Sequence, residues 1–238
     1  MSLYKKHPKL LKTALFITLI LVIFISTVSF SHKFYSVEET NSQIGYITKE
    51  FATIQGAMKL DSKRQYAIQK VFNIMNRYNR TMPEPEKLDI ANEIYKMSMR
   101  YSNLNVDLIC ATITHESALS WRKDVVSPVG ALGLMQIMPQ TGENLAKEEG
   151  IEWTTPEEVL FNPVYNIRLG SRYLSNLIHM YEIDGGLAAY NGGEKRAALW
   201  LKNRTEKTDW TLLWEETRTY VPAVLKLYEK FQQQTKIL

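Results

Sequence analysis

The sequence predicts an all-α protein, and three observations lead to this prediction. Apolar residues recur at helical spacing in most segments after residue 60. Asparagine, threonine and proline stand where they would start several of these helices. Runs of alternating polar and apolar residues, which would indicate strands, are scarce. The 238 residues, 45% hydrophobic and 23% charged, suffice for one sizeable globular domain or two small ones.

The N-terminal segment has the pattern of a membrane anchor. Residues 1–12 contain four lysines and no acidic residue, and residues 13–31 form an uncharged, apolar run of 19 residues. As a helix, such a run approaches the thickness of the hydrocarbon core of a bilayer. The lysines predict a cytoplasmic N-terminus and a remainder on the other side of the membrane. A signal peptide cleaved near Ser29-Phe30-Ser31 is the alternative.

The charge distribution argues against a nucleic-acid partner. The formal net charge is +4, but residues 32–238 contain 25 basic and 25 acidic residues, so the excess lies entirely in the N-terminal segment. The four histidines are scattered and Cys110 is the only cysteine, so we expect no metal site, and no motif indicates a cofactor. Cys110 lies in an apolar helical run, which favours a place in the core.

The chain after the apolar run is expected to form a stalk and a domain. Residues 32–85 are predicted to be a juxtamembrane segment, in which Asp61 is an N-cap candidate for a helix reaching about residue 80. Residues 86–238 are predicted to be the domain. Its helices are expected at about 86–101, 106–119, 163–181, 194–202 and 216–234.

Local signals predict where several helices begin. Asn105 is placed to cap the helix that follows it, and Asn162 stands before Pro163 at a first helical position. Thr155 and Glu158 form a capping-box pattern, and Pro139 is expected to start another helix.

One glutamate stands out because it lies on an apolar helix face. Ile109, Ile113 and Glu116 are spaced i, i+4 and i+7, so they share one face of the predicted helix. Desolvation would raise the pKa of such a carboxyl and keep it protonated near neutral pH. A protonated glutamate in an apolar cleft can act as a general acid. From the helix alone, a salt-bridged or rim glutamate is the stronger reading.

Five motifs in order change that weighting. They are HESALSW, SPVGALGLMQIMP, NPVYNIRLGSRYL, AAYNGG and ETRTYV. Together they resemble the Slt-type lytic transglycosylase domain, over roughly residues 97–225. The resemblance implies a lysozyme-like fold for the domain 86–238, and it leaves 32–85 unassigned.

The resemblance implies a role for each motif. Glu116 matches the single catalytic acid, and Ser117 matches the serine beside it, although helix back-bonding is an equally good role for that hydroxyl. Met135 and Gln136 match the loop that walls the glycan groove, where Met135 would offer an apolar surface and Gln136 hydrogen bonds. A purely structural turn is the alternative for this loop.

Later motifs supply further matches. Tyr190 and Asn191 match a saccharide-contacting pair, and Tyr220 matches a tyrosine at the back of the site; a core tyrosine is the alternative for each. Glu216 also matches, without a readable partner. We expect architectural roles rather than chemistry for the remaining matched residues, which are Asn162 as a cap, Pro163 as a helix start, Gly170 in close helix packing and His115 in packing or at the surface.

The implied reaction needs one carboxylate. Glu116 would protonate the bond between N-acetylmuramic acid and N-acetylglucosamine in peptidoglycan, and the sugar's own C6 hydroxyl would then close a 1,6-anhydro ring. A lysozyme-type hydrolase using Asp124, Asp184 or Glu194 remains an alternative, whereas Asp107 lies too far along the helix. A non-catalytic glycan-binding scaffold is the third reading. The expected partners are glycan strands and, through residues 13–31, the membrane, with the domain on its periplasmic or cell-wall side.

Overall fold

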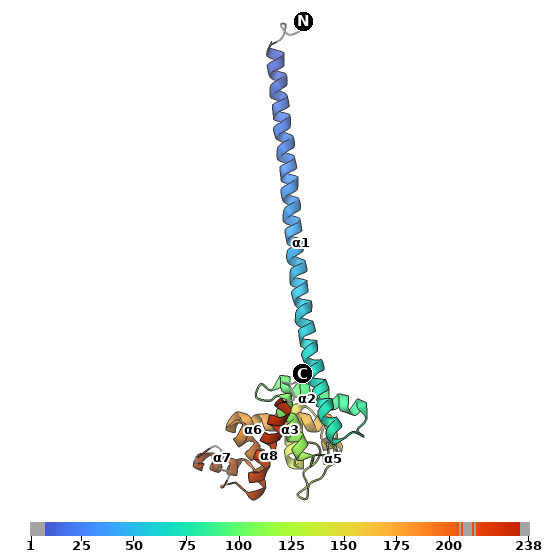
Figure 1. The fold of residues 1–238 in the computed structure, drawn as a ribbon, viewed down its shortest axis with the longest axis vertical. Helices are drawn as coiled ribbons and strands as arrows, with labels where there is room; N and C mark the ends of the chain where they lie inside the picture. Colours follow the sequence, from blue (N-terminus) through green and yellow to red (C-terminus); the bar gives the residue numbers. More distant parts are fainter. Residues whose placement is uncertain (1–7, 205, 207–210, 212, 234–238) are drawn as a thin grey trace. The chain divides into compact units, whose positions relative to one another are not determined.

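In the computed structural model the chain is all-α. The structure describes residues 8–204, 206, 211 and 213–233, and within them it forms eight helices and only isolated β-bridges (Figure 1). The chain divides into two compact units, Met1–Asp61 and Ser62–Leu238.

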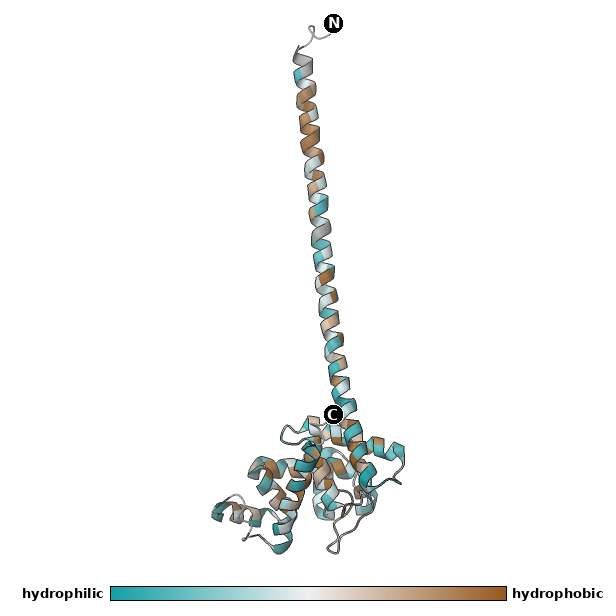
Figure 2. Ribbon diagram, in the orientation of Figure 1, coloured by the Kyte–Doolittle hydropathy of each residue, from teal (hydrophilic) through white to brown (hydrophobic). Residues whose placement is uncertain are grey.

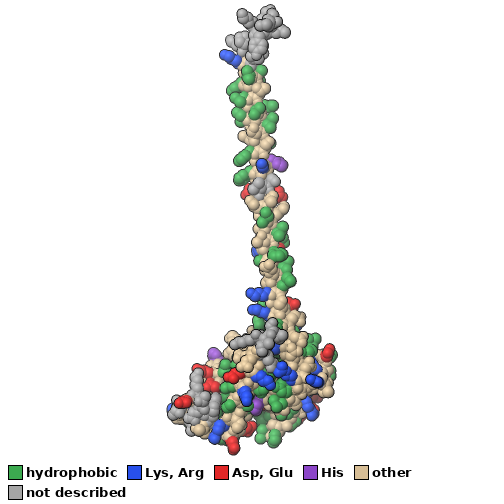
Figure 3. Space-filling view, viewed as in Figure 1, with side chains coloured by type: hydrophobic (Ala, Val, Ile, Leu, Met, Phe, Trp, Pro, Cys, Tyr) green, Lys and Arg blue, Asp and Glu red, His purple; other side chains and the backbone are tan. Residues whose placement is uncertain are grey.

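The first unit consists of the N-terminal part of α1 (Pro8–Tyr78). Its apolar side chains between Leu15 and Phe30 are exposed. Figure 2 shows this hydrophobic stretch along the ribbon, and Figure 3 shows hydrophobic side chains on the face in view. Among the described residues, α1 is the helix that is long enough and apolar enough to cross a membrane. A signal sequence near an N-terminus has the same length and composition.

The helix predicted to start at Asp61 does not start there, because α1 runs through this position without a break. The sequence contains no proline between Pro8 and Pro83, so nothing in this stretch removes a backbone donor or forces the helix to end. An aspartate inside a helix has no free N–H groups to cap. Asp61 instead marks the boundary between the two units.

The second unit begins earlier than the boundary expected at residues 85 and 86. Four side chains of the last turns of α1, namely Ile68, Val71, Ile74 and Met75, are buried in its core. Their helical spacing explains why this part of α1 packs with the domain and does not extend the stalk. The other helices are α2 (Glu84–Arg100), α3 (Val106–Glu116), α4 (Pro139–Glu149), α5 (Pro156–Leu160), α6 (Pro163–Gly192), α7 (Glu194–Asn203) and α8 (Glu215–Gln233).

Helix α3 is the buried centre of this unit. Every residue from Leu108 to Thr114 is buried, and α3 packs against α2 and α8. Helices α3 and α8 run antiparallel, since Asn105 at the start of α3 donates to Tyr228 near the end of α8. Helix α6 packs against α2, α4, α5, α7 and α8.

The predicted caps are confirmed. Asn105 Oδ1 accepts a hydrogen bond from the Leu108 N–H at 2.9 Å, and Asn162 Oδ1 accepts from the first turn of α6. Thr155 accepts from the Glu158 N–H, and Pro139 begins α4. The helix expected to end near Tyr181 is interrupted there as predicted, because Glu182 has non-helical angles (φ 61°, ψ −176°), and a second helical segment of α6 follows to Gly192. The AAYNGG motif therefore lies mainly on a helix.

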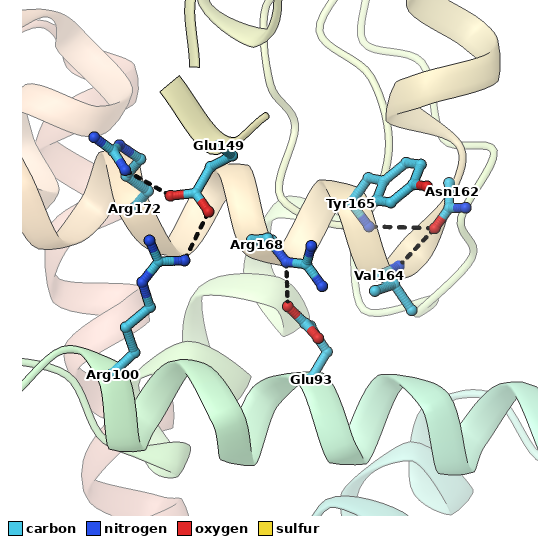
Figure 4. A network of polar contacts seen from close by, with 8 residues as sticks. All are labelled: Glu93, Arg100, Glu149, Asn162, Val164, Tyr165, Arg168 and Arg172. Carbon is cyan, nitrogen blue, oxygen red and sulfur yellow. Dashed lines mark hydrogen bonds and ion pairs between the residues drawn. The ribbon is translucent and has the colours of Figure 1, made fainter. Parts of the chain in front are cut away.

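Two glutamates whose side chains are shielded from solvent tie α2 and α4 to α6 (Figure 4). Glu93 on α2 accepts from Arg168 at 2.7 Å, and Glu149 on α4 accepts from both Arg100 and Arg172 at 2.6 Å. Burial alone would raise the pKa of the Glu149 carboxyl, but the hydrogen bonds and charges of the two arginines hold it below its usual value.

We predict that Glu149→Ala destabilises the protein by about 2 kcal/mol, because Arg100 loses its carboxylate partner and Arg172 keeps only its ion pair with the exposed Glu148. Glu148→Ala is the matched control, since that side chain is 53% exposed whereas Glu149 is 4% exposed. Urea unfolding at neutral pH measures both. The difference from wild type should shrink as the pH falls through the folded pKa of Glu149. Equal, small effects of the two substitutions would contradict this role.

Candidate active site

The site is organised around Glu116, the last residue of α3. The Tyr220 hydroxyl, on α8, donates a hydrogen bond to Glu116 Oε1 at 2.6 Å. Tyr220 is buried, and its hydroxyl bonds the carboxyl from inside the protein. The antiparallel packing of α3 on α8 therefore brings together two residues that are 104 positions apart in the sequence.

The surroundings of Glu116 keep its carboxyl poised between its two protonation states. Burial raises the pKa of this carboxyl, the hydrogen bond from Tyr220 lowers it, and the negative charge of Glu216 raises it, with the result that the pKa is about 7. A group with this pKa can donate a proton and later accept one near neutral pH.

A second tyrosine lies close to the same carboxyl. The Tyr190 hydroxyl donates to the Met135 carbonyl at 2.7 Å, and its ring lies against Tyr173 with 5.3 Å between ring centroids. Burial raises the pKa of the Tyr190 and Tyr220 hydroxyls well above the usual value, and the charge of Glu116 raises both further. Both tyrosines are therefore neutral hydrogen-bond donors.

Asn191 links α6 to α8. Its Oδ1 accepts from the Thr217 hydroxyl at 2.7 Å, and its Nδ2 donates to Glu216 Oε1 at 3.5 Å. The next residue is Gly192, where a Cβ atom would lie 2.6 Å from Thr217 Oγ1. Asn191 is thus the partner of Glu216 that the sequence did not reveal.

The glycine-rich loop before α4 is held by a buried amide. Asn166 Oδ1 accepts from the Met135 N–H at 2.7 Å, while its Nδ2 donates to the carbonyls of Leu132 and Leu160. Gly133 has a φ of 81°, and a Cβ atom there would lie 2.2 Å from Asn166 Nδ2. Only glycine fits this position without displacing the amide.

The loop residues do not have all the roles expected of them. Met135 is buried, and its side chain packs so closely on Gly170 that a Cβ at Gly170 would lie 2.5 Å from the sulfur. The expected apolar surface of Met135 is therefore turned inward. Gly170 has a close neighbour, as expected, but this neighbour is the Met135 side chain of the loop and not another helix. Gln136 uses its Nε2 within the loop, on the carbonyls of Val125 and Gly133.

Ser117 is also turned inward. It is buried at the C-terminus of α3, and its hydroxyl accepts from the Trp121 N–H at 3.0 Å. The Trp121 indole donates in turn to the Thr114 hydroxyl at 3.0 Å. A direct contact of Ser117 with a sugar does not fit this burial, and the hydroxyl instead fixes the turn that ends α3.

His115 packs, as expected. Its ring meets the Tyr220 ring edge-on, with 4.7 Å between centroids. Burial lowers the pKa of the imidazole, which favours its neutral form near pH 7. His115 thus supports the tyrosine that bonds Glu116.

The three carboxylates considered as a second acid have other partners. Asp124 forms a two-point ion pair with Arg122 at the surface, and Asp184 pairs with Arg204. Glu194 accepts from the Tyr181 hydroxyl at 3.4 Å. None of them hydrogen-bonds Glu116 or Tyr220 in the part of the chain that the structure describes. Across those same residues, no group of three or more His, Cys, Asp or Glu side chains is placed to hold a metal ion.

Sequence reasoning missed Asn166, Thr217 and Trp121. Asn166 had a readable signal, because it stands one turn after the Asn162 cap on the face of α6 that also carries buried Gly170. A side-chain amide that lies on a buried helix face and does not cap its own helix needs hydrogen-bond partners from other elements. Thr217 and Trp121 had none, since their bonds depend on contacts between helices and on the shape of a turn.

Comparison with known proteins points to one family. Residues 93–213, half of the chain, match the transglycosylase SLT domain. The chain is 35% identical to the soluble lytic murein transglycosylase of Escherichia coli K12, over 56% of this chain and 22% of that protein. It is 33% identical to the membrane-bound lytic murein transglycosylase C of Shigella sonnei, over 41% of this chain and 30% of that protein.

Solved structures agree with the sequence matches. An inactive glutamate-to-glutamine mutant of lytic transglycosylase Slt from Pseudomonas aeruginosa aligns with a TM-score of 0.55 and 27% identity, over 75% of this chain and 30% of that one. The 70 kDa soluble lytic transglycosylase from Escherichia coli aligns with the same TM-score and 26% identity, over 72% of this chain and 30% of that one. The chain therefore spans less than a third of the length of these relatives.

We predict that the Glu116 carboxyl titrates near pH 7 and that two substitutions move its pKa in opposite directions. Tyr220→Phe removes a hydrogen bond to the carboxylate and should raise the pKa, whereas Glu216→Gln removes a negative charge and should lower it. Carbon-13 NMR of labelled glutamate carboxyls, with the signal assigned by its loss in Glu116→Gln, measures the shifts. Glu229→Gln, at an exposed position on α8, is the control and should change nothing. A wild-type pKa in the ordinary range of exposed glutamates would contradict the assignment.

Proposed function

The chain belongs to the transglycosylase SLT domain family, and from this premise we propose that it is a peptidoglycan lytic transglycosylase. The proposed reaction cleaves the β-1,4 bond between N-acetylmuramic acid and N-acetylglucosamine and leaves a 1,6-anhydromuramyl end. The observation that carries the proposal is a single glutamate, Glu116, with a pKa of about 7 and a hydrogen bond from Tyr220. That arrangement fits a group that must act first as an acid and then as a base.

In the first step, protonated Glu116 donates its proton to the glycosidic oxygen. The bond between the muramyl C1 and that oxygen breaks, and the N-acetylglucosamine side leaves with a hydroxyl. Positive charge develops at C1, where the muramyl N-acetyl group and the newly formed Glu116 carboxylate can stabilise it. Tyr220 keeps its hydrogen bond throughout, and this bond is stronger to the carboxylate than to the neutral acid.

In the second step, the Glu116 carboxylate accepts the proton of the muramyl C6 hydroxyl, whose oxygen bonds to C1. The anhydro ring closes, Glu116 is protonated again, and no water is consumed. The nucleophile belongs to the same sugar, so it has a high effective concentration without a residue to position water. This is why one carboxylate is enough.

We assign substrate contacts to the polar groups around Glu116. Asn191 lies beside Glu216 at the junction of α6 and α8, and its amide and the exposed Glu216 carboxylate can bond sugar hydroxyls. Tyr190 acts by holding the loop backbone at Met135. Met135 and Gln136 stabilise this loop from within, and Ser117 stabilises the turn that follows Glu116.

A hydrolase remains the second candidate, and one observation favours a particular residue for it. Glu216 is the acidic residue whose charge raises the pKa of Glu116. If the reaction used water, Glu216 would be better placed to activate it than Asp124, Asp184 or Glu194.

We further propose that residues 13–31 anchor the protein in a membrane, with residues 1–12 in the cytoplasm and the catalytic unit outside. The uncharged run, the lysines before it and the exposed apolar surface of α1 support this proposal. In this arrangement residues 32–61 are the stalk and the unit from Ser62 acts on the cell wall.

The anchor predicts that the full chain remains in the membrane fraction through high salt and alkaline carbonate and is released only by detergent. N-terminal sequencing of the purified protein is the companion measurement. A soluble mature protein beginning near residue 32 would establish the cleaved signal peptide instead.

We predict that Glu116→Gln loses activity by a factor of about 10² or more, because glutamine keeps the size of the side chain but cannot transfer a proton. The assay is muropeptide release from purified peptidoglycan by the full chain in detergent. Asp124→Asn and Glu194→Gln are matched controls and should retain wild-type rates. If Glu116→Gln kept most of its activity while either control lost it, the acid would have been assigned to the wrong residue.

A further inference from the structure

The first unit carries an uncovered apolar stripe outside the proposed membrane span. It consists of Ile44, Ile47, Phe51, Ile54 and Met58 on α1, each 53–66% exposed. Figure 3 shows apolar side chains exposed along this helix. Every residue from 38 to 61 is exposed.

The spacing of the stripe is that of a coiled coil. Its members follow one another at steps of three, four, three and four residues. At about 100° per residue they fall within an arc of about 80° on one side of the helix. In heptad notation, Ile44, Phe51 and Met58 take position a, while Ile47 and Ile54 take position d. A repeat of seven residues keeps the stripe facing another helix with the same repeat. The line of a and d positions is called the seam.

The residues beside the seam allow the helix to pair with a copy of itself. The flanking e and g positions are Thr48, Glu50, Gln55 and Ala57, which carry a single charge between them. In a parallel pair, Glu50 at g would face Gln55 at e of the other chain, so no like charges meet. The lysines of this stretch, Lys49 and Lys59, lie at f and b on the outer side.

The same stretch is a weak helix by itself. Gly45 and Gly56 lie in its interior with no atom near the place of a Cβ, and each costs about 1 kcal/mol relative to alanine. The hydroxyls of Thr48 and Thr53 bond back to carbonyls of their own helix. Such a helix takes most of its stability from packing its apolar face, and the exposed stripe is the apolar face that this stretch offers.

We propose that this stripe is an interface with a second copy of the same chain, and that residues 44–58 form a parallel coiled coil. The parallel direction rests on the proposed anchor, which places both N-termini on one side of the membrane. The assembly would hold two catalytic units on adjoining stalks. Neither the interface nor its test depends on the reaction at Glu116.

Cysteine cross-linking of the full chain in detergent tests the proposal. The native Cys110 does not interfere, because it is buried and burial raises the pKa of its thiol. The variants Ile44→Cys, Ile47→Cys, Ile54→Cys and Met58→Cys place thiols along the seam, and Lys49→Cys and Thr53→Cys place them on the outer side. On mild oxidation the seam variants should form disulfide-linked dimers about tenfold faster or more, since a disulfide needs Cα atoms within about 7 Å.

Each other pattern contradicts a defined part of the proposal. Equal rates of disulfide formation at seam and outer positions would show that the stripe is not an interface. Failure at all four seam positions in a chain that light scattering shows to be an oligomer would show that the helices do not pair in parallel and in register.

The molar mass in solution provides the second measurement. By light scattering the wild-type chain should be an oligomer, and Ile47→Asp/Ile54→Asp should reduce it to a single chain. Lys49→Asp/Thr53→Asp is the matched control and should stay oligomeric. Circular dichroism would show that the second unit remains folded in both. A monomeric wild-type chain, or an oligomer that survives the seam substitutions, overturns the proposal while leaving the proposed activity untouched.

Discussion

The site depends on one constraint, which is that a carboxyl must be desolvated without losing its hydrogen bond. Helix α3 supplies the desolvation, because it is buried along most of its length and carries Glu116 at its last position. Helix α8 supplies the bond through Tyr220. Burial without the tyrosine would favour the neutral acid more strongly, and the tyrosine without burial would favour the carboxylate. The packing of α3 on α8 therefore sets the acidity of the reactive group.

The loop before α4 depends on close approaches that only small residues allow. Gly133 makes room for the Asn166 amide, and Gly170 makes room for Met135. The Asn166 amide then fixes the backbone at Met135, whose carbonyl accepts from Tyr190. The loop is therefore shaped from the side of α6. Its apolar side chains are mostly buried, so its composition reflects its own packing.

Features governed by local chemistry could be predicted from the sequence. Asn105 and Asn162 cap their helices because a cap needs only the first turn that follows it. The apolar face that ends in Glu116 could also be predicted, because it follows from the spacing of residues within one helix. The cap predicted at Asp61 was wrong because the same local signal also occurs inside a helix that nothing interrupts. The inward orientation of Ser117 depends on a turn with several positive φ angles, which no local pattern reveals.

Contacts between distant helices set the remaining features. Glu216 affects Glu116 only because α8 lies against α3, and its hydrogen bond with Asn191 needs α6 as well. The measurement that tests the central claim most directly is mass spectrometry of the digestion products formed in H₂¹⁸O. If Glu116 works alone, the new muramyl ends are 1,6-anhydro rings, 18 mass units lighter than hydrolysed ends, and carry no label. New reducing ends that carry ¹⁸O, after correction for exchange, and that disappear in Glu216→Gln would instead show a hydrolase with two carboxylates.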